Sequence, residues 1–88
     1  MKKETSCINS KVVLAYVKEH NGGDCAELLA NLDPEIDALQ DPESFLTDPH
    51  NWISCTVASK LYERAGRILN DEMAAYKIGQ YAVEKADL

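Results

Sequence analysis

The chain is 88 residues long, which is enough sequence for one small domain with one modest hydrophobic core. Hydrophobic residues make up 45% and charged residues 27% of it, a composition typical of a folded globular domain and unlike that of a disordered chain. Nine basic and fifteen acidic residues give a formal net charge of -6, which argues against a nucleic-acid-binding surface. A chain of this size buries only about 60–65% of its unfolded surface, so a homodimer or another partner would add stability.

Cysteine usage and hydropathy favour a cytoplasmic protein. The cysteines Cys7, Cys25 and Cys55 are odd in number, widely spaced and without a CxxC pair. A disulfide framework and a zinc site are therefore poor interpretations, whereas free thiols fit a reducing compartment. The first ten residues contain no apolar signal-peptide core, and no apolar run approaches the roughly 20 residues of a membrane span. We predict a cytoplasmic location without membrane insertion.

The first long element is predicted to be a helix over Lys11–His20, capped by Asn9 or Ser10. Its apolar residues recur with i, i+4 spacing, which is typical of a helix with one buried face. The β-branched pair Val12-Val13 also admits a strand, but strict alternation of apolar and polar residues is missing. The helix should end at Asn21-Gly22-Gly23, because glycine adopts the left-handed C-terminal conformation without a Cβ clash.

A series of short helical turns is predicted to follow. Asp24 can cap a short helix, with Glu27 three residues later as in a capping box. Three aspartate-proline pairs come next, beginning at Asp33, Asp41 and Asp48. Each pair is a cap or turn signal, because proline fits the first helical position and the aspartate side chain accepts backbone N–H groups. Residues 33–51 should therefore form short turns and not one long element.

Two longer helices are predicted to complete the domain. Apolar residues at positions 57, 61, 65 and 68 have helical spacing and predict a helix over Ser54–Leu69 with Ser54 as its N-cap. Asn70-Asp71 breaks this pattern, and a last helix should run over Asp71–Lys85. We expect these two helices to lie antiparallel at the centre of the domain. Trp52, the only tryptophan, is the largest candidate for burial.

Two glycines lie inside these predicted helices. Glycine in a helix interior costs about 1 kcal/mol relative to alanine, so a structural reason for Gly66 and Gly79 is expected. The close approach of two helix backbones would be such a reason. We predict that both glycines lie where helices cross.

No pattern in the sequence is typical of a catalytic, cofactor or metal site. A Ser/His/Asp order, a glycine-rich phosphate loop, paired carboxylates and an acidic calcium loop are not evident. His20 fits the C-terminal end of a helix, where it complements the helix dipole, and His50 fits a turn. Cys55, in the first turn of its helix, is the best candidate for a reactive thiol. We predict no catalytic residue, cofactor or metal in this segment.

One binding hypothesis remains, in which aromatic side chains line a small-molecule pocket. Packing in the hydrophobic core is the simpler interpretation of the same side chains. The residues concerned are Trp52, Tyr62, Tyr76 and Tyr81.

Three stretches resemble the N-terminal helical module of multidomain bacterial signalling proteins. In such modules a DPxNWIS turn, an LxERAxxILxD helix and an AYxIG helix recur in this order, and here they read DPHNWIS (48–54), LYERAGRILND (61–71) and AYKIG (75–79). The resemblance covers about residues 8–83. The helix–break–helix part is also similar to the start of the effector-binding region in AraC-type transcription regulators. The matched positions are caps and core positions, so the resemblance transfers no binding or catalytic residue.

These patterns predict an all-α fold: one domain over residues 1–88, built as a small bundle of four to five helices with a central antiparallel pair. The resemblance implies a regulatory or sensory input module at the N-terminus of a bacterial signalling protein, of the sensor histidine kinase type. Its partners would be other domains of the same protein, and any kinase activity would lie beyond Leu88. Two alternatives stay open: a small-molecule effector-binding domain of a transcription regulator, and a stand-alone protein-interaction domain working as a homodimer.

Overall fold

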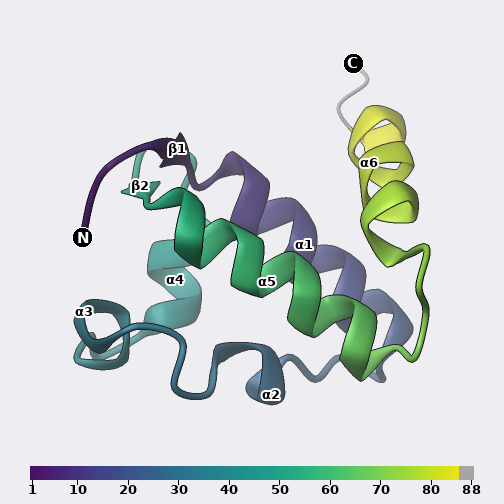
Figure 1. The fold of residues 1–88 in the computed structure, drawn as a ribbon, viewed down its shortest axis with the longest axis horizontal. Coiled ribbons are helices and arrows are strands. Elements are labelled where there is room, and N and C mark those ends of the chain that lie inside the picture. Colours follow the sequence, from purple (N-terminus) through teal and green to yellow (C-terminus); the bar gives the residue numbers. More distant parts are fainter. Residues whose placement is uncertain (86–88) are drawn as a thin grey trace.

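A computed structural model describes residues 1–85, most of which lie in helices (Figure 1). Within these residues the chain forms six helices and one two-stranded sheet, where four to five helices and no strand were predicted. In chain order the elements are β1 (Thr5–Ser6), α1 (Ile8–His20), α2 (Ala26–Leu29), α3 (Pro34–Asp37), α4 (Pro42–Leu46), β2 (Trp52–Ile53), α5 (Cys55–Ile68) and α6 (Ala74–Lys85).

The small sheet joins the beginnings of α1 and α5. Strand β1 pairs antiparallel with β2, with Thr5 opposite Ile53 and Ser6 opposite Trp52. Since β1 leads directly into α1 and β2 into α5, this pairing makes the two helices start at the same end of the domain. Strands of two residues carry no detectable alternation of apolar and polar residues, which is why the all-α prediction missed them.

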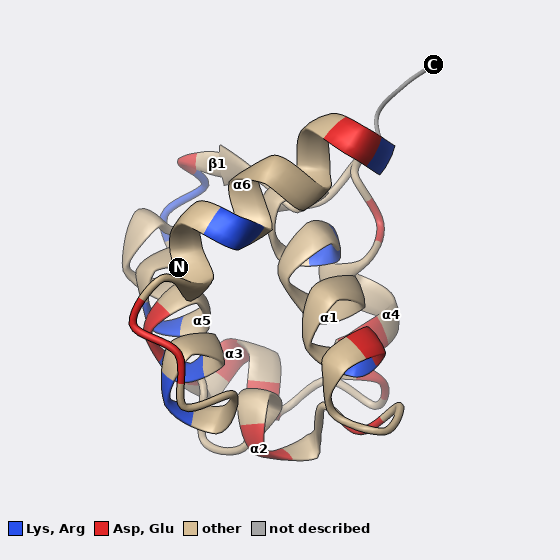
Figure 2. Cartoon of the chain, turned by 90° about the vertical axis from the view of Figure 1, so that its right-hand side faces the viewer, with Lys and Arg blue, Asp and Glu red and all other residues tan. Residues whose placement is uncertain are grey.

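Helices α1 and α5 form the centre of the domain, and α6 crosses them. Figure 1 shows α1 and α5 running side by side in the same direction, and Figure 2 shows α6 reaching from α5 to α1, both of which it contacts. The predicted antiparallel pair of α5 and α6 is therefore wrong, although the two helices do contact each other. The physical reason is the turn between them. Asn70 adopts a left-handed conformation (φ 51°), and the Asp71 N–H bonds back to the Gly66 carbonyl at 2.9 Å.

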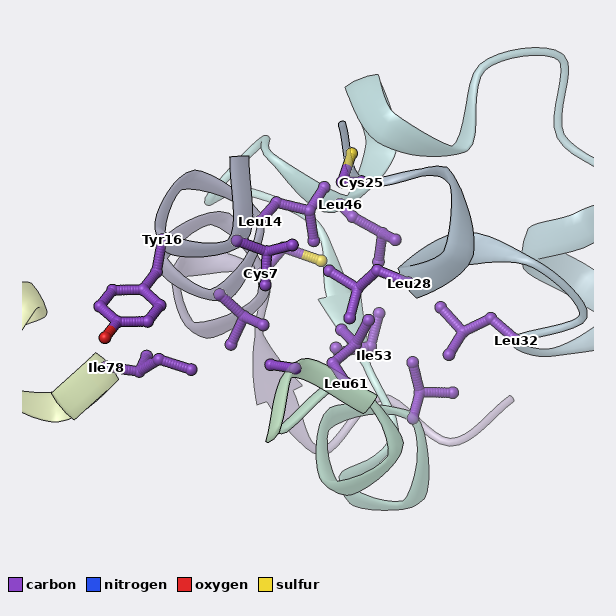
Figure 3. Close-up of a cluster of buried hydrophobic side chains, with 14 of the residues drawn as sticks. Cys7, Leu14, Tyr16, Cys25, Leu28, Leu32, Leu46, Ile53, Leu61 and Ile78 are labelled. Atoms are coloured by element: carbon purple, nitrogen blue, oxygen red, sulfur yellow. The ribbon is translucent and has the colours of Figure 1, made fainter. Parts of the chain in front are cut away.

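The hydrophobic core lies between the α1–α5 pair and the short helices α2, α3 and α4. Figure 3 shows this cluster, to which every helix contributes at least one fully buried leucine, isoleucine or valine side chain. Helix α6 contributes one of these, Ile78. Ile53 of β2 is fully buried, whereas Trp52 is 48% exposed. The predicted burial of Trp52 is wrong because successive residues of a strand point to opposite sides, and Ile53 occupies the inward position.

The caps of the short helices are largely as predicted. Asp33 accepts the Glu35 N–H at 3.0 Å, and Asp41 accepts both the N–H and the hydroxyl of Ser44. These hydrogen bonds from Ser44 hold the pKa of the Asp41 carboxyl below its ordinary value. Asp24 accepts the N–H of Ala26, but the N-cap of α2 is Cys25, without a side-chain cap hydrogen bond, so the predicted cap at Asp24 is wrong. Asp48 accepts the N–H of His50 in a turn and starts no helix.

The start of α1 differs from the prediction. The N-cap residue is Cys7, so Ser10 lies in the first turn of the helix and the Asn9 amide donates to the Thr5 hydroxyl instead of capping. Ser10 is fully buried, and its hydroxyl lies 2.5 Å from the Leu46 carbonyl of α4. This buried hydrogen bond connects α1 to α4. The sequence had suggested Ser10 only as a possible cap. The predicted end of α1 is confirmed, with Gly22 and Gly23 at positive φ.

The two helical glycines have different surroundings. A Cβ on Gly66 would lie 3.3 Å from the backbone oxygen of Asp71, which belongs to the turn after α5. The backbone does approach closely at Gly66, but it is the backbone of this turn and not that of a crossing helix as predicted. A Cβ on Gly79 would meet no atom within 4 Å, so the predicted crossing at Gly79 is wrong. Gly79 lies on the exposed side of α6.

We expect Gly79→Ala to raise the free energy of unfolding by about 0.5–1 kcal/mol, because alanine has the higher helix propensity and the added methyl group meets open space. Gly66→Ala should gain clearly less or lose stability, because the same methyl group crowds a backbone oxygen. Urea unfolding of both variants at low protein concentration compares the two. Equal stabilisation by the two substitutions would contradict the close approach at Gly66.

Candidate functional site

The four aromatic residues proposed for a pocket lie in different places. Trp52 is exposed on β2, and Tyr76 is 62% exposed on α6. Tyr62 borders one hollow, beside the turn between α5 and α6, and Tyr81 borders another, between α1 and α6. The hollows found among residues 1–85 therefore do not bring these four side chains together around one ligand.

The hollow beside Tyr81 is the candidate site, and we call it the α1–α6 wedge. It has a volume of about 470 Å³, is open to solvent and has mostly apolar walls. It is lined from α1 by Ile8, Asn9, Lys11, Val12 and Ala15, and from α6 by Tyr81, Ala82 and Lys85. The apolar residues of α1 that line it follow i, i+4, i+7 spacing, which puts them on one face of that helix. These residues could be recognised in the sequence, where the spacing of the apolar residues was interpreted as a face buried in the core.

The wedge exists because α6 is anchored mainly through its first half. Ala74 and Ile78 are the buried residues of α6, at 1% and 0% exposure. In the second half Tyr81 and Ala82 are only partly buried, and Val83 is 76% exposed. The first half of α6 is thus fixed to the core, and its second half leaves apolar surface of α1 uncovered.

Tyr81 is the main contact between the second half of α6 and α1. Its ring packs edge to face on Tyr16 with the centroids 5.4 Å apart, and Tyr16 in turn stacks on His20 at 4.1 Å. The Lys85 Nζ lies 5.4 Å from the centroid of the Tyr81 ring. Loss of hydration raises the pKa of the Tyr81 hydroxyl, so it stays protonated at neutral pH. Aromatic pairs of this kind contribute about 0.5–1.5 kcal/mol beyond their buried area.

The charged residues of the wedge are both basic. Lys11 and Lys85 stand among its walls, although the chain as a whole carries a net charge of -6. Neither lysine takes part in a salt bridge within residues 1–85. The wedge thus combines an apolar floor with positive charge at its edge, a combination that suits an apolar group bearing a negative charge.

A second cluster of reactive side chains lies at the other end of α1. Lys18 forms an ion pair with Glu43, and the Cys25 Sγ lies 3.7 Å from the same carboxylate. Burial and the neighbouring Glu43 raise the pKa of the Cys25 thiol, so the nucleophilic thiolate is disfavoured. Burial also raises the pKa of the Cys7 thiol. These two cysteines therefore act as small core side chains.

We expect one thiol of the native protein to react quickly with Ellman's reagent. Cys55 is exposed, whereas Cys7 and Cys25 are 0% and 5% exposed. The two buried thiols should react only at the rate at which the domain opens, because the reagent must reach a thiolate. Release of the coloured thiolate measures the phases, with a urea-denatured sample giving the total. Rapid reaction of two or three thiols in the native protein would contradict the burial.

Two further observations concern residues 1–85. No group of three or more histidine, cysteine, aspartate or glutamate side chains in this range is arranged to hold a metal ion. None of the helices in the same range combines the length and the apolar character that crossing a membrane requires.

Comparison with protein-family models, with curated proteins and with solved structures finds no match for this chain. Its function is therefore inferred from the geometry of the wedge and of α6.

Proposed function

We propose that this chain is a regulatory input module of a bacterial signalling protein, of the sensor histidine kinase type, without catalysis in this segment. The observation that carries the proposal is the α1–α6 wedge, an apolar hollow whose two walls belong to different helices. The resemblance of residues 48–54, 61–71 and 75–79 to the N-terminal module of such proteins supports the same function.

The mechanism is a change in the packing of α6. An occupant of the wedge would press between Val12 of α1 and Ala82 of α6, which both line it. Because Ala74 and Ile78 hold the first half of α6 in place, the second half would pivot about them. The last helix would then carry the signal to other domains of the same protein.

The free energy that such a switch requires is comparable with that of a small buried apolar contact. Reversing a two-state equilibrium from 1:99 to 99:1 takes about 5.5 kcal/mol of differential binding. Burying roughly 200 Å² of apolar surface provides about 5 kcal/mol. An occupant that buries this area only when α6 has shifted therefore provides a free energy of the same order as the switch requires.

The gene beyond codon 88 gives the first test. A reading frame that continues into a phosphoacceptor helix and an ATP-binding domain supports the proposal. A helix-turn-helix domain in that place would overturn it in favour of an effector-binding module of a transcription regulator. A stop codon would overturn it in favour of a stand-alone interaction domain.

The second test fills the α1–α6 wedge with a larger side chain of the protein itself. Ala82→Trp in the complete protein should change the rate of autophosphorylation, because the indole ring occupies the hollow and displaces the second half of α6. Ala26→Trp on the exposed first turn of α2 is the matched control and should leave the rate unchanged. Identical rates in the wild type and Ala82→Trp, with the domain folded by circular dichroism, would count against signalling through α6.

The alternative function, binding of a small effector, is favoured by the positive edge of the wedge. Lys11 and Lys85 flank apolar walls, which fits a medium-chain carboxylate better than a neutral molecule. Octanoate should then raise the melting temperature, octanol should raise it less, and Lys11→Gln should remove the difference. If neither compound raises the melting temperature, this alternative function is wrong.

A further inference from the structure

Three apolar features lie together at one end of the domain. Trp52 of β2 is 48% exposed, and its partner in the sheet is Ser6 of β1. The Ser6 hydroxyl accepts the N–H of Ile8 at 3.1 Å, and Ile8 is itself 54% exposed and lines the α1–α6 wedge. The exposed tryptophan, the exposed isoleucine and the wedge are therefore neighbours along β2, β1 and the start of α1. We give the name β1 end to residues 1–15, 52–53 and 81–85.

The β1 end differs in charge from the opposite end of the domain. Its side chains include four lysines and two glutamates, which gives a net charge of +2. Residues 24–48 contain eight acidic residues and no lysine or arginine, which gives a net charge of -8. In both views β1 and α6 lie above α2 and α3, which belong to residues 24–48 (Figure 1, Figure 2). The negative charge of the chain is therefore concentrated away from the β1 end.

Two lysines of the β1 end stand at the wedge itself. Lys11 belongs to α1 and Lys85 to α6, and neither takes part in a salt bridge within residues 1–85. Together with the apolar walls they form a surface complementary to an apolar group that is joined to an anion. A second copy of this chain does not fit, because the lysines of the two β1 ends would meet. The anionic lipids of a bilayer supply both parts, and tryptophan is enriched at the level of their headgroups.

We propose that the β1 end binds the surface of a bilayer that contains anionic lipids. Trp52 and Ile8 lie in the headgroup region, Lys11 and Lys85 contact lipid phosphates, and the wedge receives part of an acyl chain. The contact is peripheral, because the domain lies on the bilayer and does not span it. The inference rests on the wedge that the proposed function also uses, and it names the occupant of that wedge.

The acidic residues of the opposite end do not prevent this contact. The domain measures 29 × 28 × 20 Å. The Debye length is about 8 Å at physiological ionic strength, so a bilayer at the β1 end is largely screened from charges at the far end. The lysines at the surface are not screened in this way, and each one strengthens binding to an anionic membrane about fivefold. The charge that decides the binding is therefore the local charge of the β1 end and not the net charge of the chain.

The fluorescence of Trp52 tests the proposal, because this residue is the only tryptophan of the chain. Vesicles of phosphatidylglycerol and phosphatidylcholine in equal parts, added to the 88-residue chain at low ionic strength, should shift its emission to shorter wavelength as the indole leaves water. Vesicles of phosphatidylcholine alone should give a clearly smaller shift, and about 0.5 M NaCl should reverse the shift with anionic vesicles. No shift with anionic vesicles, or equal shifts with both compositions, would overturn the proposal.

Variants that remove one positive charge locate the contact. Lys11→Gln and Lys85→Gln should each lower the partition coefficient into anionic vesicles about fivefold, and the double variant about 25-fold. Arg67→Gln is the matched control, because it removes the same charge from the last turn of α5, away from β2, and it should bind like the wild type. Cosedimentation with vesicles measures the partition, and circular dichroism checks the fold. Equal weakening by Arg67→Gln and Lys11→Gln would overturn the assignment of the contact to the β1 end.

The same measurements separate a bilayer from a free carboxylate as the occupant of the wedge. If octanoate raises the melting temperature while vesicles neither pellet the protein nor shift the Trp52 emission, the wedge binds a free acid and the membrane proposal is wrong. Lipid binding and kinase output are measured separately, so the two proposals can fail independently. Vesicle binding by the wild type, together with an unchanged autophosphorylation rate in Ala82→Trp, would support the membrane contact and count against signalling through α6.

Discussion

Replacing Leu61 with alanine is expected to lower the free energy of unfolding by about 3 kcal/mol. Leu61 is fully buried on the inward face of α5 and belongs to the cluster drawn in Figure 3. Truncation of a buried leucine removes the transfer free energy of the lost atoms and leaves a cavity, which together cost about 2–5 kcal/mol. The site cannot collapse easily, because α5 is in contact with α1, α2 and α6 at once.

The matched controls separate core packing from general effects of mutation. Leu61→Met keeps the volume and should cost under about 1.5 kcal/mol. Leu39→Ala removes the same atoms from a residue that is 38% exposed and should cost much less than Leu61→Ala. In thermal unfolding, Leu61→Ala should lower the midpoint by roughly 12–24 °C. A shift of only a few degrees would mean that α5 is not at the centre of the core.

The sequence predicted those parts of the fold that depend on local chemistry. The caps at Asp33, Asp41 and Ser54 depend on residues within three positions of one another, so they are visible without a structure. The same holds for the glycines that end α1. The range predicted for α5 was correct to within its two cap residues because its apolar spacing is strong and regular.

The parts that failed depend on partners far away in the chain. Trp52 is exposed because Ile53 takes the inward position of a strand that exists only through pairing with residues 5 and 6. The direction of α6 depends on the left-handed Asn70 and on a hydrogen bond from Asp71 to Gly66. Neither the pairing of the two strands nor the turn before α6 produces a periodic pattern in the sequence. The sequence singled out the aromatic residues, but the surface that each one faces depends on its direction in the folded chain.

Replacing Arg64 with alanine is expected to destabilise the domain by about 2–3 kcal/mol through a different mechanism. The Arg64 guanidinium donates hydrogen bonds to the carbonyls of Leu28, Ala30 and Asn31, at 3.1, 2.6 and 3.0 Å. These carbonyls lie at the end of α2 and just after it, and a helix of four residues cannot satisfy them itself. Hydrogen bonds to a charged group contribute about 1.5–3 kcal/mol each where they are shielded, and less where they are solvated as in part here.

Two neighbouring substitutions make the Arg64 test specific. Arg64→Lys should recover only a minor part of the loss, because one ammonium cannot replace the planar fork that reaches three carbonyls. Arg67→Ala removes the same type of side chain one turn later, where it forms an exposed pair with Glu63, and should cost under about 0.5 kcal/mol. Hydrogen exchange should show the loss of protection in Arg64→Ala beginning at residues 26–32, since this segment depends on Arg64 for its attachment to α5. Uniform loss of protection across α1 and α5, or equal cost for Arg64→Ala and Arg67→Ala, would show that Arg64 does not fasten this segment.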